Sequence, residues 1–457
     1  METRKPNIVL INCDDLGYGD LGCYGSRVNN TPTLDQMAEK GIRFTNFYMA
    51  SPVCSPSRGS MLTGCYPRRI GFGNFEGRGV LFPGQGVGLN PEEITIARLL
   101  KNVGYNTMLV GKWHCGDQPE FLPTRHGFDH YYGLPYSNDM GRQAGRNERE
   151  GYPPLPLMLD EEVIQEQPDQ ASLTERYVEQ CVRFIRKNKD TPFFLYFAHM
   201  YVHLPIYAPE RFLKQSRNGD YGAAVECIDW SVSVILDELK TQGLDKNTLV
   251  IFTSDNGARG DRGSSNAPLR GGKMTTWEGG MRVPCIMYWP GVIPSGQVCD
   301  EIITSMDFYP TIARFAGAGI PLDRIIDGKD ISSIVLGEEG AKSPHKAFFY
   351  YHGDNLEAVR SGDWKLHIRK GDREVRELYN LREDISESHN VYEKYPEIVK
   401  KLEEYIDECR KDLGDKAAGI EGENIRPIGR VENPVPLTHY NPDHPYIIAM
   451  YDKEDTG

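Results

Sequence analysis

Four short and almost continuously apolar runs recur along this chain of 457 residues. They occupy residues 7–12, 107–110, 193–197 and 249–252. Continuous apolar runs of this length are typical of parallel strands that are buried on both faces. Amphipathic helical patterns lie between them, and strands that alternate with helices indicate a sheet between two helical layers. The sequence therefore predicts an α/β fold with a mostly parallel central sheet flanked by helices.

The pattern changes in the last quarter of the chain. Residues 347–351 and 356–360 read as antiparallel strands around a Gly-Asp-Asn turn, and residues 397–413 read as a charged amphipathic helix. We therefore expect two domains. The larger is an α/β domain over residues 1–340, and the smaller is an α+β domain, with an antiparallel sheet and a helix, over residues 341–457.

Polar side chains follow each of the four apolar runs. They are Asp14 and Asp15 after the first run, Lys112 and His114 after the second, His199 and His203 after the third, and Asp255 and Asn256 after the fourth. Ligand sites in parallel sheets lie beyond the carboxyl ends of the strands. We therefore expect these side chains to meet in a single site.

The first and fourth runs are followed by oxygen ligands alone. Asp14, Asp15, Asp255 and Asn256 suit a hard divalent cation, Ca²⁺ above all, whereas zinc would call for histidine or cysteine. Two adjacent aspartates by themselves are more often a turn or a helix cap. The metal interpretation therefore depends on the two pairs lying together.

Residues 54–64, with the sequence CSPSRGSMLTG, place a cysteine at the expected first turn of a helix. Pro56 suits an early helical position and Gly64 suits a helix end. A helix N-terminus attracts anions, and Arg58 adds a cation on the face that Cys54 occupies. This combination indicates chemistry on an anionic group. The alternative is an ordinary helix with a half-buried cysteine.

The same segment resembles the signature of the type I, formylglycine-dependent sulfatases, Cys-x-Pro-Ser-Arg-x-x-x-Leu-Thr-Gly, at every fixed position. Four further segments resemble motifs of the arylsulfatase A and N-acetylgalactosamine-6-sulfatase type, in the family's order: residues 14–25, 111–114, 253–257 and 269–284. The resemblance covers about residues 7–415. It implies an alkaline phosphatase-like fold and hydrolysis of sulfate monoesters.

The resemblance also implies a role for each residue of the site. A maturation enzyme would oxidise Cys54 to formylglycine, whose hydrated aldehyde attacks sulfur. One Ca²⁺ would be held by Asp14, Asp15, Asp255, Asn256 and the formylglycine at position 54. Lys112, Lys273 and Ser137 would bind the sulfate, and Arg58 would stabilise the hydrate. His114 would accept a proton, and His203, with Lys273, would protonate the leaving oxygen. His367 is expected to contact the substrate, or to be a plain strand residue.

The net charge of −13 makes nucleic acid and densely sulfated polymers poor partners, because the field of the protein repels polyanions. The expected substrate is a small sulfated carbohydrate, such as a hexosamine or galactose sulfate, with aryl sulfates as artificial substrates. Two alternatives stay open. One is hydrolysis of phosphate monoesters or phosphonates, and the other is a glycan-binding protein in which Cys54 is not matured.

The sequence as written has no apolar run near the roughly 20 residues that span a bilayer, and its N-terminus has no apolar signal-peptide core. We therefore expect a cytoplasmic protein without a membrane partner, or a periplasmic or secreted protein if a signal peptide has been removed. The sequence does not indicate an oligomeric state.

Overall fold

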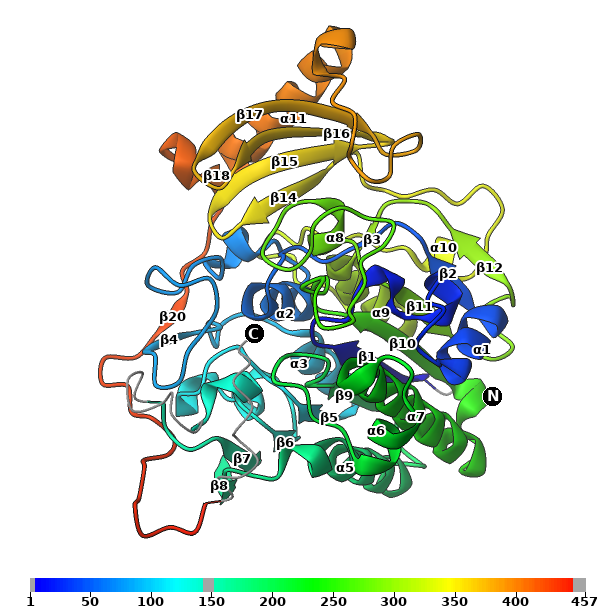
Figure 1. Ribbon diagram of the computed structural model, residues 1–457, viewed down its shortest axis with the longest axis vertical. Helices are drawn as coiled ribbons and strands as arrows, with labels where there is room; N and C mark the ends of the chain where they lie inside the picture. The colour runs from blue at the N-terminus through cyan, green and yellow to red at the C-terminus, as the bar shows by residue number, and fades with distance from the viewer. Residues whose placement is uncertain (1–4, 143–151, 447–457) are drawn as a thin grey trace.

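The computed structural model describes residues 5–142 and 152–446, and its core is a ten-stranded sheet (Figure 1). The strands are β1 (Asn7–Cys13), β2 (Ile42–Phe44), β5 (Asn106–Gly111), β6 (His130–Gly133), β7 (Pro156–Leu159), β8 (Glu162–Glu166), β9 (Phe193–Ala198), β10 (Thr248–Ser254), β11 (Cys285–Tyr288) and β12 (Gln297–Cys299). Their order across the sheet is β12-β2-β11-β10-β1-β9-β5-β6-β7-β8.

The four predicted apolar runs form the middle of this sheet. β10, β1, β9 and β5 are neighbours and run parallel, and β6 continues the parallel arrangement. On one side β11 pairs antiparallel with β10, β2 pairs antiparallel with β11, and β12 pairs parallel with β2. On the other side β7 and β8 add two antiparallel pairings beyond β6. The predicted α/β fold is confirmed, and the antiparallel additions at both edges are features that the apolar runs did not indicate.

Helices cover both faces of the sheet (Figure 1). One face packs against α1 (Pro32–Lys40), α5 (Leu173–Lys187) and α7 (Gly219–Thr241), and the other against α2 (Cys54–Thr63), α3 (Ile96–Lys101) and α9 (Phe308–Ala316). The shorter helices are α6 (Glu210–Gln215), α8 (Glu278–Met281) and α10 (Ser332–Val335). Among the described residues, no helix is both long and apolar enough to cross a lipid bilayer.

The alternation of side chains along β1 explains why the strand is apolar throughout. Ile8 and Leu10 lie in the cluster that contains α2, whereas Val9 and Ile11 lie in the cluster that contains α7. Successive side chains of a strand point to opposite faces, so a strand between two helical layers needs apolar residues at every position.

A separate antiparallel sheet lies at one end of the molecule (Figure 1). It consists of β14 (Phe348–His352), β15 (Asn355–Ser361), β16 (Trp364–Lys370) and β17 (Arg373–Asn380), and it packs against α11 (Pro396–Leu413). The same cluster includes Tyr48 and Met281 of the larger part. The predicted small sheet and helix are therefore present, while the division at residue 340 stays a prediction.

The last described segment leaves the small sheet and returns to the larger part of the molecule. β20 (Gly429–Arg430) pairs with β4 (Val87–Gly88), and the Thr438 hydroxyl donates a hydrogen bond to the carbonyl of Pro154. Two further short pairs are β3 (Phe47–Tyr48) with β13 (Ile303–Thr304), and β18 (Gly414–Asp415) with β19 (Ile420–Glu421).

Gly111 ends β5 at a point where two strands approach closely. Its φ is +108°, and a Cβ added there would lie 1.9 Å from the carbonyl oxygen of Ala198. A residue with a side chain would therefore be both strained and in collision with the backbone of β9. This position fixes the direction in which the next residue, Lys112, leaves the sheet.

We expect Gly111→Ala to lower the free energy of unfolding by about 1–3 kcal/mol more than Gly104→Ala, because overpacking adds to the cost of a positive φ. Gly104 is the matched control, since its φ is +90° and no described atom lies within 4 Å of an added Cβ. Urea unfolding of the two variants measures the difference. Equal losses would contradict the steric argument.

Candidate active site

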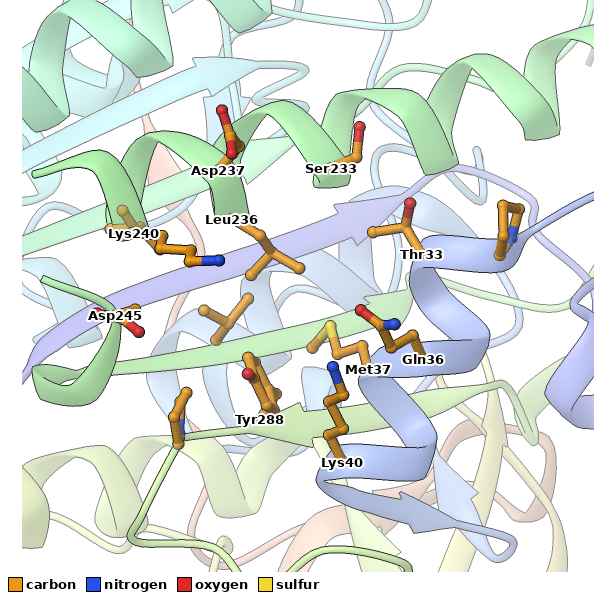
Figure 2. A pocket seen from close by; sticks show the side chains of 14 residues that line it. Thr33, Gln36, Met37, Lys40, Ser233, Leu236, Asp237, Lys240, Asp245 and Tyr288 are labelled. Atoms are coloured by element: carbon orange, nitrogen blue, oxygen red, sulfur yellow. The ribbon is translucent and has the colours of Figure 1, made fainter. Parts of the chain in front are cut away.

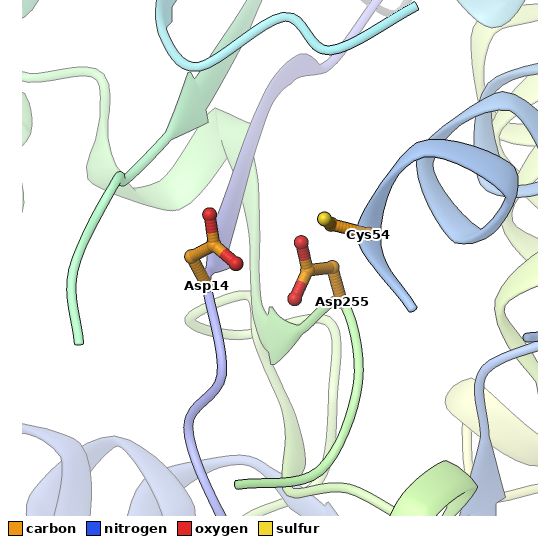
Figure 3. Close-up of side chains that lie close together, drawn as sticks. All are labelled: Asp14, Cys54 and Asp255. Atoms are coloured by element: carbon orange, nitrogen blue, oxygen red, sulfur yellow. The ribbon is translucent and has the colours of Figure 1, made fainter. Parts of the chain in front are cut away.

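The ends of β1 and β10 and the start of α2 meet at one edge of the sheet. The Sγ atom of Cys54 and one carboxylate oxygen from each of Asp14 and Asp255 lie within 4.8 Å of one another. Figure 3 shows the three side chains pointing into a common space between these elements. All three are buried, so the larger part of the molecule encloses them.

Asp15 and Asn256, the second residues of the two pairs, also lie together. The Asn256 amide donates a hydrogen bond to Asp15 Oδ1 at 2.7 Å. Asp15 Oδ2 accepts from Lys273 Nζ at 2.8 Å and lies 3.9 Å from His203 Nε2. Lys273 therefore reaches the site from a loop more than 250 residues after the first aspartate pair.

Lys112 and Ser137 extend the cluster on the side of Asp14. Lys112 Nζ lies 2.5 Å from Asp14 Oδ2 and donates to Ser137 Oγ at 3.3 Å. Ser137 Oγ in turn lies 3.4 Å from the His203 ring nitrogens. A continuous polar path thus connects the ends of three strands, because Asp14 follows β1, Lys112 follows β5 and His203 follows β9.

Arg58 is fully buried one turn into α2 and joins three of the strand ends. Its Nε and Nη2 atoms lie 2.8 and 2.7 Å from Asp255 Oδ2, and Nη1 donates to the Lys112 carbonyl at 2.8 Å. Nη2 is also 3.5 Å from Asp14 Oδ2. A guanidinium has five donors in a rigid plane, so one side chain can satisfy acceptors on β1, β5 and β10 at once.

The buried charges shift one another's pKa values. Burial raises the pKa of Asp255 to about 7, and the neighbouring Asp14 contributes to the rise. Burial would also raise the pKa of Asp14, but the neighbouring basic groups, Lys112 above all, outweigh it and hold that pKa well below its usual range. The Asp14 carboxylate therefore stays ionised, with Lys112 as its nearest counter-charge.

Cys54 is not a thiolate in this environment. Burial raises its pKa to about 11, although Lys112 and Lys273 act in the opposite direction. The unmodified side chain is therefore a neutral thiol at physiological pH, which is a poor nucleophile. A reaction at this position needs a group other than the encoded cysteine.

Two oxygen atoms of the cluster are left without partners among the described residues. They are Asp14 Oδ1 and Asn256 Oδ1, and both are buried. Buried polar atoms normally have a partner, and a hard cation prefers oxygen ligands of this kind. The two pairs together, with the group at position 54, therefore have the composition of a calcium site.

His114 lies beside the cluster on the segment that follows Lys112. Its ring is fully buried, and Nε2 lies 2.9 Å from the carbonyl oxygen of Leu81. Burial and the adjacent Lys112 lower its pKa well below the usual value, so the ring is neutral. Leu81 also binds Ser55 Oγ through its N–H group. Nothing in the sequence marks Leu81, because it acts through main-chain atoms.

Two residues of the site have backbone conformations that residues other than glycine rarely adopt. The φ angles are +59° for Asp15 and +57° for His114. Positive φ angles in residues other than glycine cost free energy and cluster at functional sites. Here they follow directly on β1 and β5, where the chain turns sharply to direct both side chains into the cluster.

His199 and His367 are placed differently from the cluster. His199 is buried, packs against Phe197 and accepts a hydrogen bond from the Tyr201 N–H group at 3.2 Å. His367 is fully buried on β16, where Nε2 lies 2.8 Å from Glu387 Oε1 and the ring packs against Trp277. The expected substrate contact of His367 stays a prediction, and in this structure its polar contact is a carboxylate.

A hollow of about 450 Å³ lies elsewhere, between α1 and α7 (Figure 2). Met37, Lys40, Leu236, Lys240 and Tyr288 are among the residues that line it. The predicted site residues are not part of its lining. The candidate active site is therefore recognised by the convergence of charged side chains and not by the size of a cavity.

Comparisons with known proteins agree with this geometry. A family model described as Sulfatase matches residues 6–318, and a model described as N-sulphoglucosamine sulphohydrolase, C-terminal, matches residues 272–412. N-acetylgalactosamine-6-sulfatase of Canis lupus familiaris is 42% identical over 383 residues, which are 80% of this chain and 72% of that protein. Steryl-sulfatase of Rattus norvegicus is 39% identical, over 79% of this chain and 75% of that protein.

A solved structure gives the same result. The crystal structure of Ps i-CgsB in complex with k-i-k-neocarrahexaose superposes with a TM-score of 0.79 at 30% identity, covering 89% of this chain and 92% of that chain. The predicted resemblance is therefore confirmed by a family model over most of the chain and by relatives of high identity. The chain belongs to the sulfatase family and is a sulfuric ester hydrolase.

Proposed function

We propose that this sulfatase removes sulfate from a small sulfated sugar, such as a hexosamine or galactose sulfate, at the cluster around Cys54. The observation that carries the proposal is the meeting of Lys112 and Lys273 beside Cys54 and the two carboxylate pairs. The names of two similar proteins, an N-acetylgalactosamine-6-sulfatase and a protein crystallised with k-i-k-neocarrahexaose, support a sugar substrate. The name of a third, steryl-sulfatase, provides the alternative to test.

We further propose that Asp14, Asp15, Asp255 and Asn256 hold one Ca²⁺ and that a maturation enzyme converts Cys54 to formylglycine. Held by these residues, the ion would supply positive charge for polarising the sulfate oxygens. Formylglycine would supply a hydrated aldehyde with two hydroxyl groups on one carbon. One hydroxyl would be the nucleophile, and loss of the proton from the other would release sulfate and restore the aldehyde. The unpartnered oxygens of Asp14 and Asn256 and the protonated thiol of Cys54 support these assignments.

Lys112 and Lys273 would bind the sulfate oxygens, with Ser137 as a third contact. The Lys112 ammonium group pairs with Asp14, and the Lys273 ammonium group pairs with Asp15. Fixed cations stabilise the charge that develops on sulfate oxygens during transfer, because they need no reorganisation at the moment of reaction. Arg58, held by Asp255, would keep the group at position 54 in place.

The hydrogen bonds of His114 indicate which of its nitrogen atoms accepts a proton. The carbonyl of Leu81 can accept but not donate, so the Nε2 atom beside it carries the hydrogen. Nδ1 is then the basic atom, and among the described residues it has no partner. Since the ring is neutral, Nδ1 of His114 can take the proton that the second hydroxyl of the hydrate loses when sulfate is released.

The same reasoning applies to His203. Its Nδ1 lies 2.6 Å from the carbonyl oxygen of Leu204, so Nδ1 carries the hydrogen and Nε2 faces Asp15. Burial and Lys273 lower the pKa of His203, so the ring is neutral in this state. An anionic sulfate ester beside it would favour the protonated ring, and Nε2 could then donate a proton to the leaving oxygen.

Cys54→Ala is expected to lower turnover of 4-nitrophenyl sulfate by at least about 10⁴-fold, because the nucleophile cannot form. Cys115→Ala is the matched control, since Cys115 is a buried cysteine that follows His114 and has no assigned role. Initial rates and the intact mass of the peptide around residue 54 measure the effect, and the matured residue is lighter than cysteine. Undiminished turnover in Cys54→Ala would contradict the mechanism.

Removal of Ca²⁺ with a chelator is expected to abolish turnover, and added Ca²⁺ is expected to restore it. Asn256→Ala should raise the Ca²⁺ concentration needed for half-maximal rate by about 10–100-fold, since a ligand oxygen is lost. Asp237→Asn, in the hollow of Figure 2, should leave that concentration unchanged. A calcium titration of the parent protein and the two variants measures this concentration. Equal values for all three proteins would mean that the ion binds elsewhere.

The substrate proposal is tested by comparing kcat/KM for sulfated sugars and a steryl sulfate. We expect N-acetylgalactosamine 6-sulfate or galactose 6-sulfate to be hydrolysed at least about tenfold more efficiently than the steryl sulfate, because Arg259, Asp261, Arg262 and Ser264 are among the residues that line the small hollow beside Asp15. The matching sugar phosphates keep the leaving alcohol and replace the transferred sulfuryl group by a phosphoryl group, so they test the phosphatase alternative. A preference for the steryl sulfate would refute the sugar assignment while leaving the sulfatase chemistry intact.

A further inference from the structure

The loop that carries Lys273 lies between the active site and the small C-terminal sheet. On the side of the active site, the Lys273 N–H group donates to the carbonyl of Ala258 at 3.0 Å, and the Met274 N–H group donates to the carbonyl of Pro52 at 3.0 Å. The main chain around Lys273 is thus bonded to the segments that carry Asn256 and Cys54. The other side of the loop faces residues that the reaction itself does not use.

Glu387 binds both ends of this loop. Its main-chain carbonyl accepts a hydrogen bond from Arg270 Nη1 at 2.7 Å, three residues before Lys273. Its carboxylate oxygen Oε2 accepts from the Glu278 N–H group at 2.7 Å, five residues after Lys273. The Glu387 side chain is fully buried, so these bonds form away from water.

Two residues of β16 hold the Glu387 carboxylate in place. Lys365 Nζ lies 2.9 Å from Glu387 Oε1, and His367 Nε2 lies 2.8 Å from the same atom. Lys365 also donates to the carbonyl of Thr276 at 2.8 Å and lies 3.0 Å from Glu278 Oε1. All these side chains are fully buried, so each charge depends on its partners for compensation.

A third contact fixes the middle of the loop. The Thr276 hydroxyl donates to Glu357 Oε2 on β15 at 2.6 Å. The small sheet therefore contacts the loop at Thr276 and Glu278, and Glu387 contacts it at Arg270 and Glu278. The active site contacts the loop at Lys273 and Met274. Buried ion pairs are weak sources of stability but give a definite geometry, and here that geometry is imposed on the segment that presents Lys273.

We infer that Glu387 is a positioning residue that sets the location of the Lys273 ammonium group in the active site. The inference rests on the proposed role of Lys273 in sulfate binding. Glu387 fixes both ends of the loop, Lys365 and His367 orient the Glu387 carboxylate, and the small sheet thereby contributes to sulfate binding without touching the sulfate. A displacement of a binding group by about 1 Å can cost about 100-fold in rate.

The test is a double-mutant cycle between Glu387 and Lys273. We expect Glu387→Ala to lower kcat/KM for 4-nitrophenyl sulfate by about 10–100-fold and to weaken inhibition by inorganic sulfate. In a Lys273→Ala background, the same change should lower kcat/KM by less than about threefold, because the group that Glu387 positions is absent. A general loss of structure would instead give the same factor in both backgrounds, and that result would overturn the inference.

Asp415→Asn is the matched control for stability. Asp415 is fully buried in the same part of the chain and pairs with Arg410 at 3.0 Å. We expect it to lower the melting temperature as Glu387→Ala does, while kcat/KM and sulfate inhibition stay within about twofold of the parent protein. A similar loss of kcat/KM in Asp415→Asn would show that lower stability alone is sufficient to explain the loss in Glu387→Ala.

Two milder variants cover the case in which Glu387→Ala does not fold. Glu387→Gln keeps one carbonyl oxygen for the Glu278 N–H group, and Arg270→Ala removes the bond at the other end of the loop without leaving a buried charge. Each should lower kcat/KM less than Glu387→Ala and lose its effect when Lys273 is absent. If neither variant changes kcat/KM, the inference is wrong. Undiminished kcat/KM in Lys273→Ala alone would refute the proposed role of that lysine, and the inference with it.

Discussion

The compensation of buried negative charge at the carboxyl edge of the sheet is the constraint on which the rest of the structure depends. Asp14 and Asp255 end neighbouring parallel strands and are fully buried. Arg58 lies between them with ion-pair contacts to both, and it is the first helical turn of α2 that brings it there. The helix that balances the carboxylates is therefore the same helix that presents Cys54, so charge balance and the placement of Cys54 are one structural requirement.

The lysines extend this requirement to more distant parts of the chain. Lys112 follows β5 beside the sheet, and the turn at Gly111 directs it toward Asp14. Lys273 has no strand of its own and reaches Asp15 from a loop that is bonded on its far side to β15, β16 and Glu387. The small sheet is thus part of the support of the active site, although the family's signature segments lie almost entirely outside it.

The sequence predicts the central sheet and the cluster at its edge because both follow from local patterns. Each apolar run is continuous in sequence, and the polar residues after it must share the edge where parallel strands end. Three features have no such pattern. The hairpin of β7 and β8 is only partly apolar, the pairing of β20 with β4 joins residues more than 300 positions apart, and Leu81 acts through its main chain. Glu387 looks like a surface residue in sequence, and its burial follows only from tertiary contacts with β16.

Every residue of α2 is buried, and Cys54 itself is only 2% exposed. If Cys54 is oxidised as we propose, the maturation enzyme would have to reach a segment that the folded molecule encloses. The proposed oxidation would therefore have to precede the burial of α2. Under this proposal, a molecule that folded first would enclose an unreacted thiol, and the active fraction of a preparation would depend on how many chains were oxidised before they folded.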